Sequence, residues 1–236
     1  MQGQNEGMSM ENQTISLFGK QVKLPEKFSK RVVMTISGVI VCAFAVGFFK
    51  CAVFGVDPFQ SFAQGIHIGF IEKFMSYGTY YMLISLLMLV VDFFLDKQYI
   101  GIATFINLFL TGYVVDFSVW VIRKVLPDPG LAQRIGMLLI AIVVMCFASS
   151  LYMTSNLGVS VYDAIPIIIS KRKKWPFRFC RIGTDLICVI IGALSLYFTG
   201  NDVLSLLGIG TVITAFFMGP LIEFFNITVA RPFLNK

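Results

Sequence analysis

The sequence predicts an all-α, polytopic membrane protein, and three observations lead to that prediction. Hydrophobic residues make up 57% of the chain and charged residues 14%, whereas a soluble domain carries about 25% charge. Apolar runs of about 20 residues recur, which is the length that an α-helix needs to cross roughly 30 Å of hydrocarbon. Glycine, threonine, acidic and basic residues also recur at offsets that drift only from 103 to 107 residues, which indicates an internal repeat.

Eight segments are expected, six long and two short. The long apolar segments lie near residues 32–54, 78–96, 100–122, 134–155, 182–199 and 204–226, and the short ones near 58–71 and 160–170. Residues 1–30 are polar and basic, and we expect them to form a cytoplasmic tail. The turn-rich Pro127–Gly130 stretch separates two membrane units, residues 31–126 and 131–236.

Each unit is predicted to be a long helix, a short helix and two long helices. At an offset of 103 residues, Gly55-Val56 corresponds to Gly158-Val159. At an offset of 107 residues, Gly101 corresponds to Gly208 and Thr104 to Thr211. The sequence therefore predicts a tandem duplication, in which each copy contains one helix break.

The orientation of the two copies depends on whether the short segments cross the membrane. If they cross, the copies are parallel, and only Lys50 and Lys97 among the basic residues lie outside the cell. If they enter and return, the copies are inverted, and a basic group with Lys73 and Arg123 lies outside. Because lysine and arginine concentrate in cytoplasmic loops, the parallel arrangement is favoured. It places a pseudo-two-fold axis along the membrane normal, with the two breaks facing a shared hollow.

Two stretches carry a resemblance to a known family. The pattern GVSVYDA, the basic turn KRKKWPFRF and the later GIGTVITAFFMGPLIEFF resemble the bacterial YczE/YitT-type membrane proteins. Val161 stands where that family usually has proline, Gln60 replaces the acid of the first copy, and Glu223 replaces an aspartate. The resemblance implies an uncharacterised protein of the bacterial cytoplasmic membrane, for which transport is often suspected. The positions assigned to helix breaks or close packing are Gly55, Pro58, Gly158, Gly208, Gly210, Gly219 and Pro220.

Polar residues at the two short segments are the candidates for substrate binding. They are Asp163, Tyr162, Gln60, Ser160, Asn156 and His67. Asp163 is either an acid in the first turn of a helix, favoured by the helix dipole, or a ligand for substrate or ion. His67 is either an interior histidine with its hydrogen bonds satisfied or a proton carrier.

Three other acids, Asp116, Glu223 and Asp185, are expected to form ion pairs with neighbouring helices or bases. The basic cluster Lys171–Lys174 is expected to set the topology, and it could also bind anionic lipid. The cysteines lack the spacing of a metal or redox site, so they are interpreted as buried small hydrophobic residues. No metal, cofactor or nucleic-acid partner is expected.

The duplicated fold with paired helix breaks favours a small-molecule transporter whose substrate site lies between the repeats. The alternative is a membrane protein without transport activity that supports another membrane system. An intramembrane enzyme is not expected, because the sequence has no HExxH motif and no serine placed with a histidine.

Overall fold

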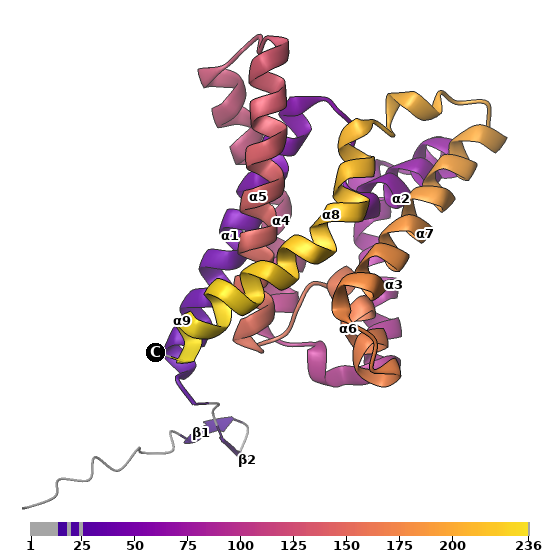
Figure 1. Ribbon diagram of the computed structural model, residues 1–236. Helices are drawn as coiled ribbons and strands as arrows, with labels where there is room; N and C mark the ends of the chain where they lie inside the picture. The colour runs from indigo at the N-terminus through magenta and orange to yellow at the C-terminus, as the bar shows by residue number, and fades with distance from the viewer. Residues whose placement is uncertain (1–13, 18–19, 24–25, 236) are drawn as a thin grey trace, which may run out of the picture.

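The structure is a computed structural model that describes residues 14–17, 20–23 and 26–235 (Figure 1). A short antiparallel hairpin of β1 (Thr14–Leu17) and β2 (Lys20–Lys23) precedes the helices. The α-helices are α1 (Phe28–Ala52), α2 (Pro58–Ile66), α3 (Tyr77–Asp96), α4 (Ile102–Val125), α5 (Leu131–Ser155), α6 (Val161–Lys173), α7 (Phe177–Phe198), α8 (Ile209–Phe225) and α9 (Arg231–Asn235). Shorter π or 3₁₀ turns are η1 (His67–Ile71), η2 (Lys97–Tyr99), η3 (Val203–Ser205) and η4 (Asn226–Ala230).

Within the described residues, five helices are long and apolar enough to cross a membrane. They are α1, α3, α5, α7 and the continuous segment from α8 to α9. The helix α4 is a sixth candidate, bent by 45° between its halves 102–111 and 113–125. Large apolar side chains such as Leu87, Phe94 and Phe109 point outward, as they do in a protein that is solvated by lipid. The prediction of a helical, polytopic membrane protein is confirmed.

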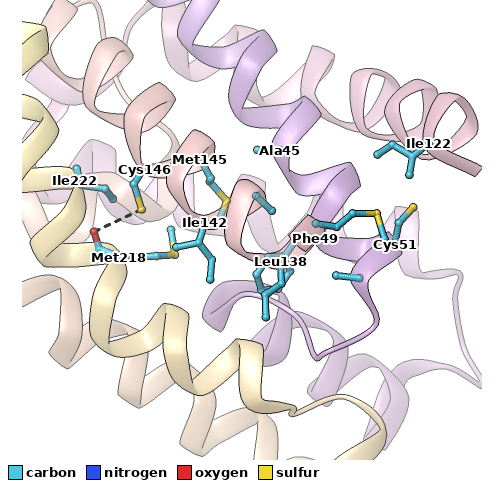
Figure 2. Close-up of a cluster of buried hydrophobic side chains, with 13 residues drawn as sticks. Ala45, Phe49, Cys51, Ile122, Leu138, Ile142, Met145, Cys146, Met218 and Ile222 are labelled. Carbon is cyan, nitrogen blue, oxygen red and sulfur yellow. Dashed lines mark hydrogen bonds between the residues drawn. The ribbon is translucent and has the colours of Figure 1, made fainter. Parts of the chain in front are cut away.

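A core of buried hydrophobic residues joins α1, α4, α5 and α8. Phe49, Ile142 and Met218 are among its members, which Figure 2 shows converging from three helices. The Cys146 thiol lies in this core, 3.9 Å from the carbonyl oxygen of Met218. Among the described cysteines, Cys51, Cys146 and Cys180 are buried, and all five are free thiols. These residues pack as small hydrophobic side chains, as predicted.

The helices α1 and α5 run in opposite directions, which corrects the predicted parallel arrangement. Near the start of α1, Arg31 Nη1 donates to the carbonyl oxygen of Ser155, the last residue of α5, at 2.8 Å. Lys27 Nζ donates to the carbonyl oxygen of Leu234 at 3.1 Å, so both ends of the described helical chain lie together. We call the end of the bundle with Arg31, Ser155 and Asn235 the terminal end. The end where α1 and α7 finish and α8 begins, with Phe54, Thr199 and Gly208, is the opposite end; the ribbons of these helices can be followed to it in Figure 1.

The two short helices enter the bundle and return, so the expectation that they cross the membrane is also wrong. Tyr99, at the terminal end, accepts a hydrogen bond from Val159 N before α6, and its ring lies under Lys171 Nζ near the end of α6. The segment from Leu157 to Lys173 therefore begins and ends near the same end of the bundle, and the first turn of α6 lies inside it. The segment of α2 and η1 likewise begins after Phe54 and ends with Gly69 against Thr199, at the opposite end. Each segment is about 20 Å long at 1.5 Å per residue, too short for a crossing of about 30 Å.

The antiparallel arrangement also explains why counting basic residues misled the sequence prediction. The rule is statistical and concerns loops, whereas the direction of a helix is set by the helix on which it packs. Buried contacts such as the one from Thr35 Oγ1 to Ser155 Oγ, 2.7 Å long, fix that direction.

Candidate functional site

Each short helix follows a helix break that is anchored on the other half of the chain. After α1, the carbonyl oxygen of Phe54 accepts a hydrogen bond from Gly210 N at 2.9 Å, at the start of α8. After α5, the carbonyl oxygen of Leu157 accepts a hydrogen bond from Ala103 N at 3.0 Å, at the start of α4. The first break is thus held by a helix of the second half, and the second break by a helix of the first half.

Two threonines complete this reciprocal arrangement. Thr211 Oγ1 donates to the carbonyl oxygen of Val56 at 2.6 Å, and Thr104 Oγ1 donates to the carbonyl oxygen of Val159 at 2.7 Å. Both threonines are buried. They therefore satisfy backbone carbonyls that the helix breaks leave without an intrahelical partner, which a membrane interior requires.

Glycine is required at both breaks for two reasons. Gly55 and Gly158 have positive φ angles of 108° and 99°, which residues with a side chain rarely adopt. A Cβ atom at Gly55 would lie 2.5 Å from Gly208 N, and one at Gly158 would lie 2.5 Å from Gly101 N. The predicted roles of Gly55, Gly158 and Gly208 as break and packing positions agree with this geometry.

The first turns of α2 and α6 meet inside the bundle. Asp57 caps α2 by accepting from Gln60 N at 3.1 Å, and Ser160 Oγ caps α6 by accepting from Asp163 N at 3.1 Å. The ring of Phe59 then stacks on the ring of Tyr162, with centroids 4.8 Å apart and planes 16° from parallel. Two helix N-termini, which carry partial positive charge, thus approach each other from opposite ends of the bundle.

Beside this contact lies a buried ionic cluster centred on Arg181 of α7. Its guanidinium pairs with Asp163 through Nη1 and with Asp185 through Nε, the latter at 3.2 Å. The same guanidinium lies over the ring of Tyr162, 4.7 Å from the centroid. Relative exposure is 4% for Arg181, 4% for Asp163 and 0% for Asp185, so the cluster has almost no contact with solvent.

Hydroxyl groups supply the remaining hydrogen bonds of the two carboxylates. Tyr152 and Ser160 donate to Asp163 Oδ2, and Tyr162 donates to Asp185 Oδ1. In each of these hydrogen bonds the carboxylate is the acceptor. The geometry therefore suits two ionised carboxylates that share one guanidinium. Removing one partner from such a buried pair costs about 3–5 kcal/mol, because the other charge is left uncompensated.

Gln60 lies in the first turn of α2, as Asp163 lies in the first turn of α6. Gln60 Oε1 accepts from the hydroxyl of Tyr77 at 2.6 Å and from Gln64 Nε2 at 3.2 Å. His67 follows at the end of α2, where its ring is buried and its Nε2 lies 2.9 Å from the carbonyl oxygen of Met75. Rings of Tyr77 and Tyr80 pack around the imidazole, so His67 is an interior histidine with one ring nitrogen hydrogen-bonded.

The structure brings together some of the candidate residues and separates others. Asp163, Tyr162, Ser160 and Gln60 lie in the first turns of the two short helices or at their caps. Asn156 lies in the break after α5, in a left-handed conformation (φ 56°), with an exposed side chain. The expected hollow between the breaks is occupied at its centre by the stacked rings of Phe59 and Tyr162.

Of the three acids expected in ion pairs, only Asp185 forms one among the described residues. Asp116 is exposed on α4. Glu223 lies on α8, and its Oε2 is buried without a hydrogen-bond partner in the described structure. On the same helix, a Cβ at Gly219 would lie 2.9 Å from the carbonyl oxygen of Arg178, so Gly219 permits the close approach of α7.

The basic cluster Lys171–Lys174 ends α6 and is exposed at the terminal end. Two of its four bases contact the protein: Lys171 lies over the ring of Tyr99, and Arg172 donates to the carbonyl oxygen of Leu95. These contacts hold the end of α6 against α3 and η2.

Sequence reasoning missed three residues of this region. Arg181 stands just before the predicted segment 182–199, among the bases expected on the cytoplasmic side, although it is the centre of the buried cluster. Tyr152 and Asp92 were not singled out, yet both are almost completely buried. An aspartate or arginine within an apolar segment is the signal that points to such a residue, and Asp92 stands within the run from Leu83 to Leu95.

A surface hollow of about 270 Å³ lies away from this site, between α1 and α5. Its lining is apolar and includes Ile40, Phe44, Phe48 and Val144. Among the described residues, no group of three or more histidine, cysteine, aspartate or glutamate side chains is arranged to hold a metal ion.

Comparison with known proteins supports the expected resemblance. Residues 29–227 match a family described as a family of unknown function, DUF6198. The chain is similar to the uncharacterized protein YyaS of Bacillus subtilis (strain 168), with 23% identity over 201 residues that cover 84% of this chain and 94% of that protein. It is also similar to the uncharacterized membrane protein YczE of the same organism, with 21% identity over 193 residues that cover 80% and 81% of the two chains. No solved structure matches.

Proposed function

We propose that this chain, which belongs to the DUF6198 family of unknown function, is a transporter of a small molecule. Its substrate site forms where α2 and α6 meet. The single observation that carries this proposal is the meeting of two half-helices from opposite ends of the bundle, at the stacked Phe59 and Tyr162. In many transporters, broken helices of two inverted repeats form the substrate site near the middle of the membrane.

The proposal includes a duplicated fold, with inverted copies. The reciprocal hydrogen bonds support it, because Phe54 and Leu157 stand at the same offset as Gly55 and Gly158. Their hydrogen-bond partners, Gly210 and Ala103, are 107 residues apart, which is the offset between Gly101 and Gly208. Inverted copies place the pseudo-two-fold axis in the plane of the membrane, and they give each face of the protein one half-helix.

The buried charges further support a site for chemistry rather than for packing alone. Ionisable residues inside a membrane are costly, and they mark substrate or ion pathways more often than they stabilise a fold. Arg181, Asp163 and Asp185 lie beside the contact between the half-helices. In the structure described, Phe59 and Tyr162 close this contact, and we propose that their separation opens the site.

We further propose that the terminal end faces the cytoplasm of a bacterial cell. Lys27, Lys30, Arg31 and the cluster Lys171–Lys174 belong to this end. Fewer of the described bases, among them Lys73 and Arg123, belong to the opposite end. This distribution agrees with the excess of positive charge in cytoplasmic loops.

The test uses the purified full-length chain in detergent and in proteoliposomes. A library of metabolites is screened for compounds that raise the melting temperature, and each hit is then tested for uptake into the vesicles. We expect a hit to be transported, and we expect Phe59→Ala to weaken both effects while the exposed Phe74→Ala leaves them unchanged. Uptake that is equal in both variants would place the site elsewhere.

The alternative of an accessory protein has its own outcome. If no compound stabilises the folded chain, no uptake is found, and a stoichiometric partner copurifies from native membranes, the transport proposal is wrong.

A further inference from the structure

Buried acidic residues outnumber buried basic ones in the membrane part of the chain. Among the described residues, the buried acids are Asp92, Asp163 and Asp185, and the buried arginine is Arg181. The guanidinium compensates one of these charges. Because an uncompensated charge in a low-dielectric interior costs several kcal/mol, a proton bound to one of these acids would reduce the net negative charge of the interior.

The hydrogen bonds show which of the three acids has a carboxylate oxygen available to bind a cation or a proton. Asp163 and Asp185 are both occupied, since each receives a hydrogen bond from Arg181 and at least one from a hydroxyl group. Asp92 differs from both, because its Oδ1 is buried and has no hydrogen-bond partner in the described structure. Its relative exposure is 1%.

Asp92 lies on α3, which packs against α6, the half-helix that carries Asp163. Asp92 and Asp163 therefore belong to two helices that are in direct contact. Other titratable or charged groups on the elements packed against α3 are Asp57 before α2, His67 on η1, Tyr99 on η2, and Tyr162, Lys171, Arg172 and Lys173 on α6. Arg172 donates to the carbonyl oxygen of Leu95, three residues after Asp92 on α3, and Lys171 lies over the ring of Tyr99. None of these is an ion-pair partner of Asp92.

A proton suits Asp92 better than a metal ion does. No three acidic, histidine or cysteine side chains converge in the described part of the chain in the way that a metal ion requires. A proton needs only one oxygen, and the neutral carboxylic acid avoids the cost of a buried charge.

We propose that Asp92 carries a proton that is taken up and released during the transport cycle. The proton comes from water at one face of the membrane, binds the carboxylate to give the neutral acid, and leaves to water at the other face when the site opens there. The packing of α3 against α6 couples this step to the contact between the half-helices, because Asp163 at the start of α6 is held by Arg181 of α7 beside that contact. This inference rests on the proposed transport function and names its coupling ion.

The test reads the proton directly and needs no substrate. Infrared spectra of the purified full-length chain are recorded across a pH series, and the carbonyl stretch of a protonated carboxylic acid is followed. We expect a band from a buried acid that disappears as the pH rises. Asp92→Asn, which is neutral and nearly isosteric, removes this band, whereas the exposed Asp116→Asn retains it.

A second variant tests whether the loss of the band in Asp92→Asn is due to misfolding. Asp92→Glu keeps a carboxylic acid at the position, and we expect it to restore a titrating band at a shifted pH. A band that persists unchanged in Asp92→Asn, or its absence from the wild-type chain at every pH, would overturn the inference.

The outcome separates this inference from the proposed function. If the band depends on Asp92 but no compound is transported, the proton site stands and the transport proposal fails. If a compound is transported and an imposed proton gradient drives it equally well in wild type and Asp92→Asn, transport stands and the role of Asp92 falls.

Discussion

The rings of Phe59 and Tyr162 are stacked with centroids 4.8 Å apart, and the two residues occupy the same place in the two short helices. Each is the second residue of its helix, and each follows a capping residue, Asp57 or Ser160. In the duplication that we propose, two corresponding residues touch only near the axis that relates the copies. The stacked pair therefore marks the point about which the proposed inverted halves are arranged.

The antiparallel course of α1 and α5 predicts on which face each loop can be labelled. Single cysteines at Lys73 and at Lys173 should react with a membrane-impermeant thiol reagent from opposite sides of oriented vesicles, because the first lies at the opposite end and the second at the terminal end. A cysteine at Arg123 is the control and should match Lys73. The native cysteines are replaced beforehand. Labelling of Lys73 and Lys173 from one side would restore the parallel arrangement.

Replacement of the break glycines should be costly. Gly158→Ala forces a side chain into a positive φ angle and against the backbone of Gly101, so we expect a loss of at least about 1–3 kcal/mol of stability. Gly183→Ala is the matched control, because a Cβ there meets no atom within 4 Å. The measurement is the melting temperature in detergent. Equal melting temperatures for the two variants would contradict the close approach of Gly158 and Gly101.

Loss of Arg181 should be far more harmful than loss of a neighbouring arginine. Arg181→Met leaves Asp163 and Asp185 buried without a counter-charge, and we expect a destabilisation of about 3–5 kcal/mol. Arg178→Met, at an exposed position on the same helix, should change the stability little. Adding Asp163→Asn to Arg181→Met should restore part of the loss, since it removes one of the stranded charges. No recovery in the double variant would mean that the two side chains do not act as a pair.

The threonines of the two breaks should have similar effects when replaced. Thr104→Val and Thr211→Val each remove the donor to a buried carbonyl oxygen while nearly preserving side-chain shape, so we expect about 1–3 kcal/mol for each. The exposed Thr228→Val provides the control. Chemical denaturation in detergent, followed by circular dichroism, gives the comparison. A large loss for one threonine and none for the other would argue against equivalent breaks.

Much of the fold could be predicted from the sequence. The apolar runs gave the long helices, and the glycines with their flanking turn residues marked both breaks within a few residues of their observed positions. Asp163, Tyr162 and Gln60 were identified as neighbours of those breaks. These features are local, because hydrophobicity, helix length and the conformational freedom of glycine depend on a short stretch of chain.

The direction of the halves and the composition of the site could not be predicted in the same way. Arg181 was assigned to a loop because its charge fits a cytoplasmic position, and Asp92 passed unnoticed within an apolar run. The sequence by itself determined that this chain forms membrane helices with two breaks. Only the tertiary structure decided that α1 and α5 are antiparallel, that α2 and α6 meet inside the bundle, and that one arginine serves two acids. Burial and pairing arise between segments more than a hundred residues apart, such as the hydrogen bond from Arg31 to Ser155. A local sequence pattern does not specify which distant helix a given helix packs against.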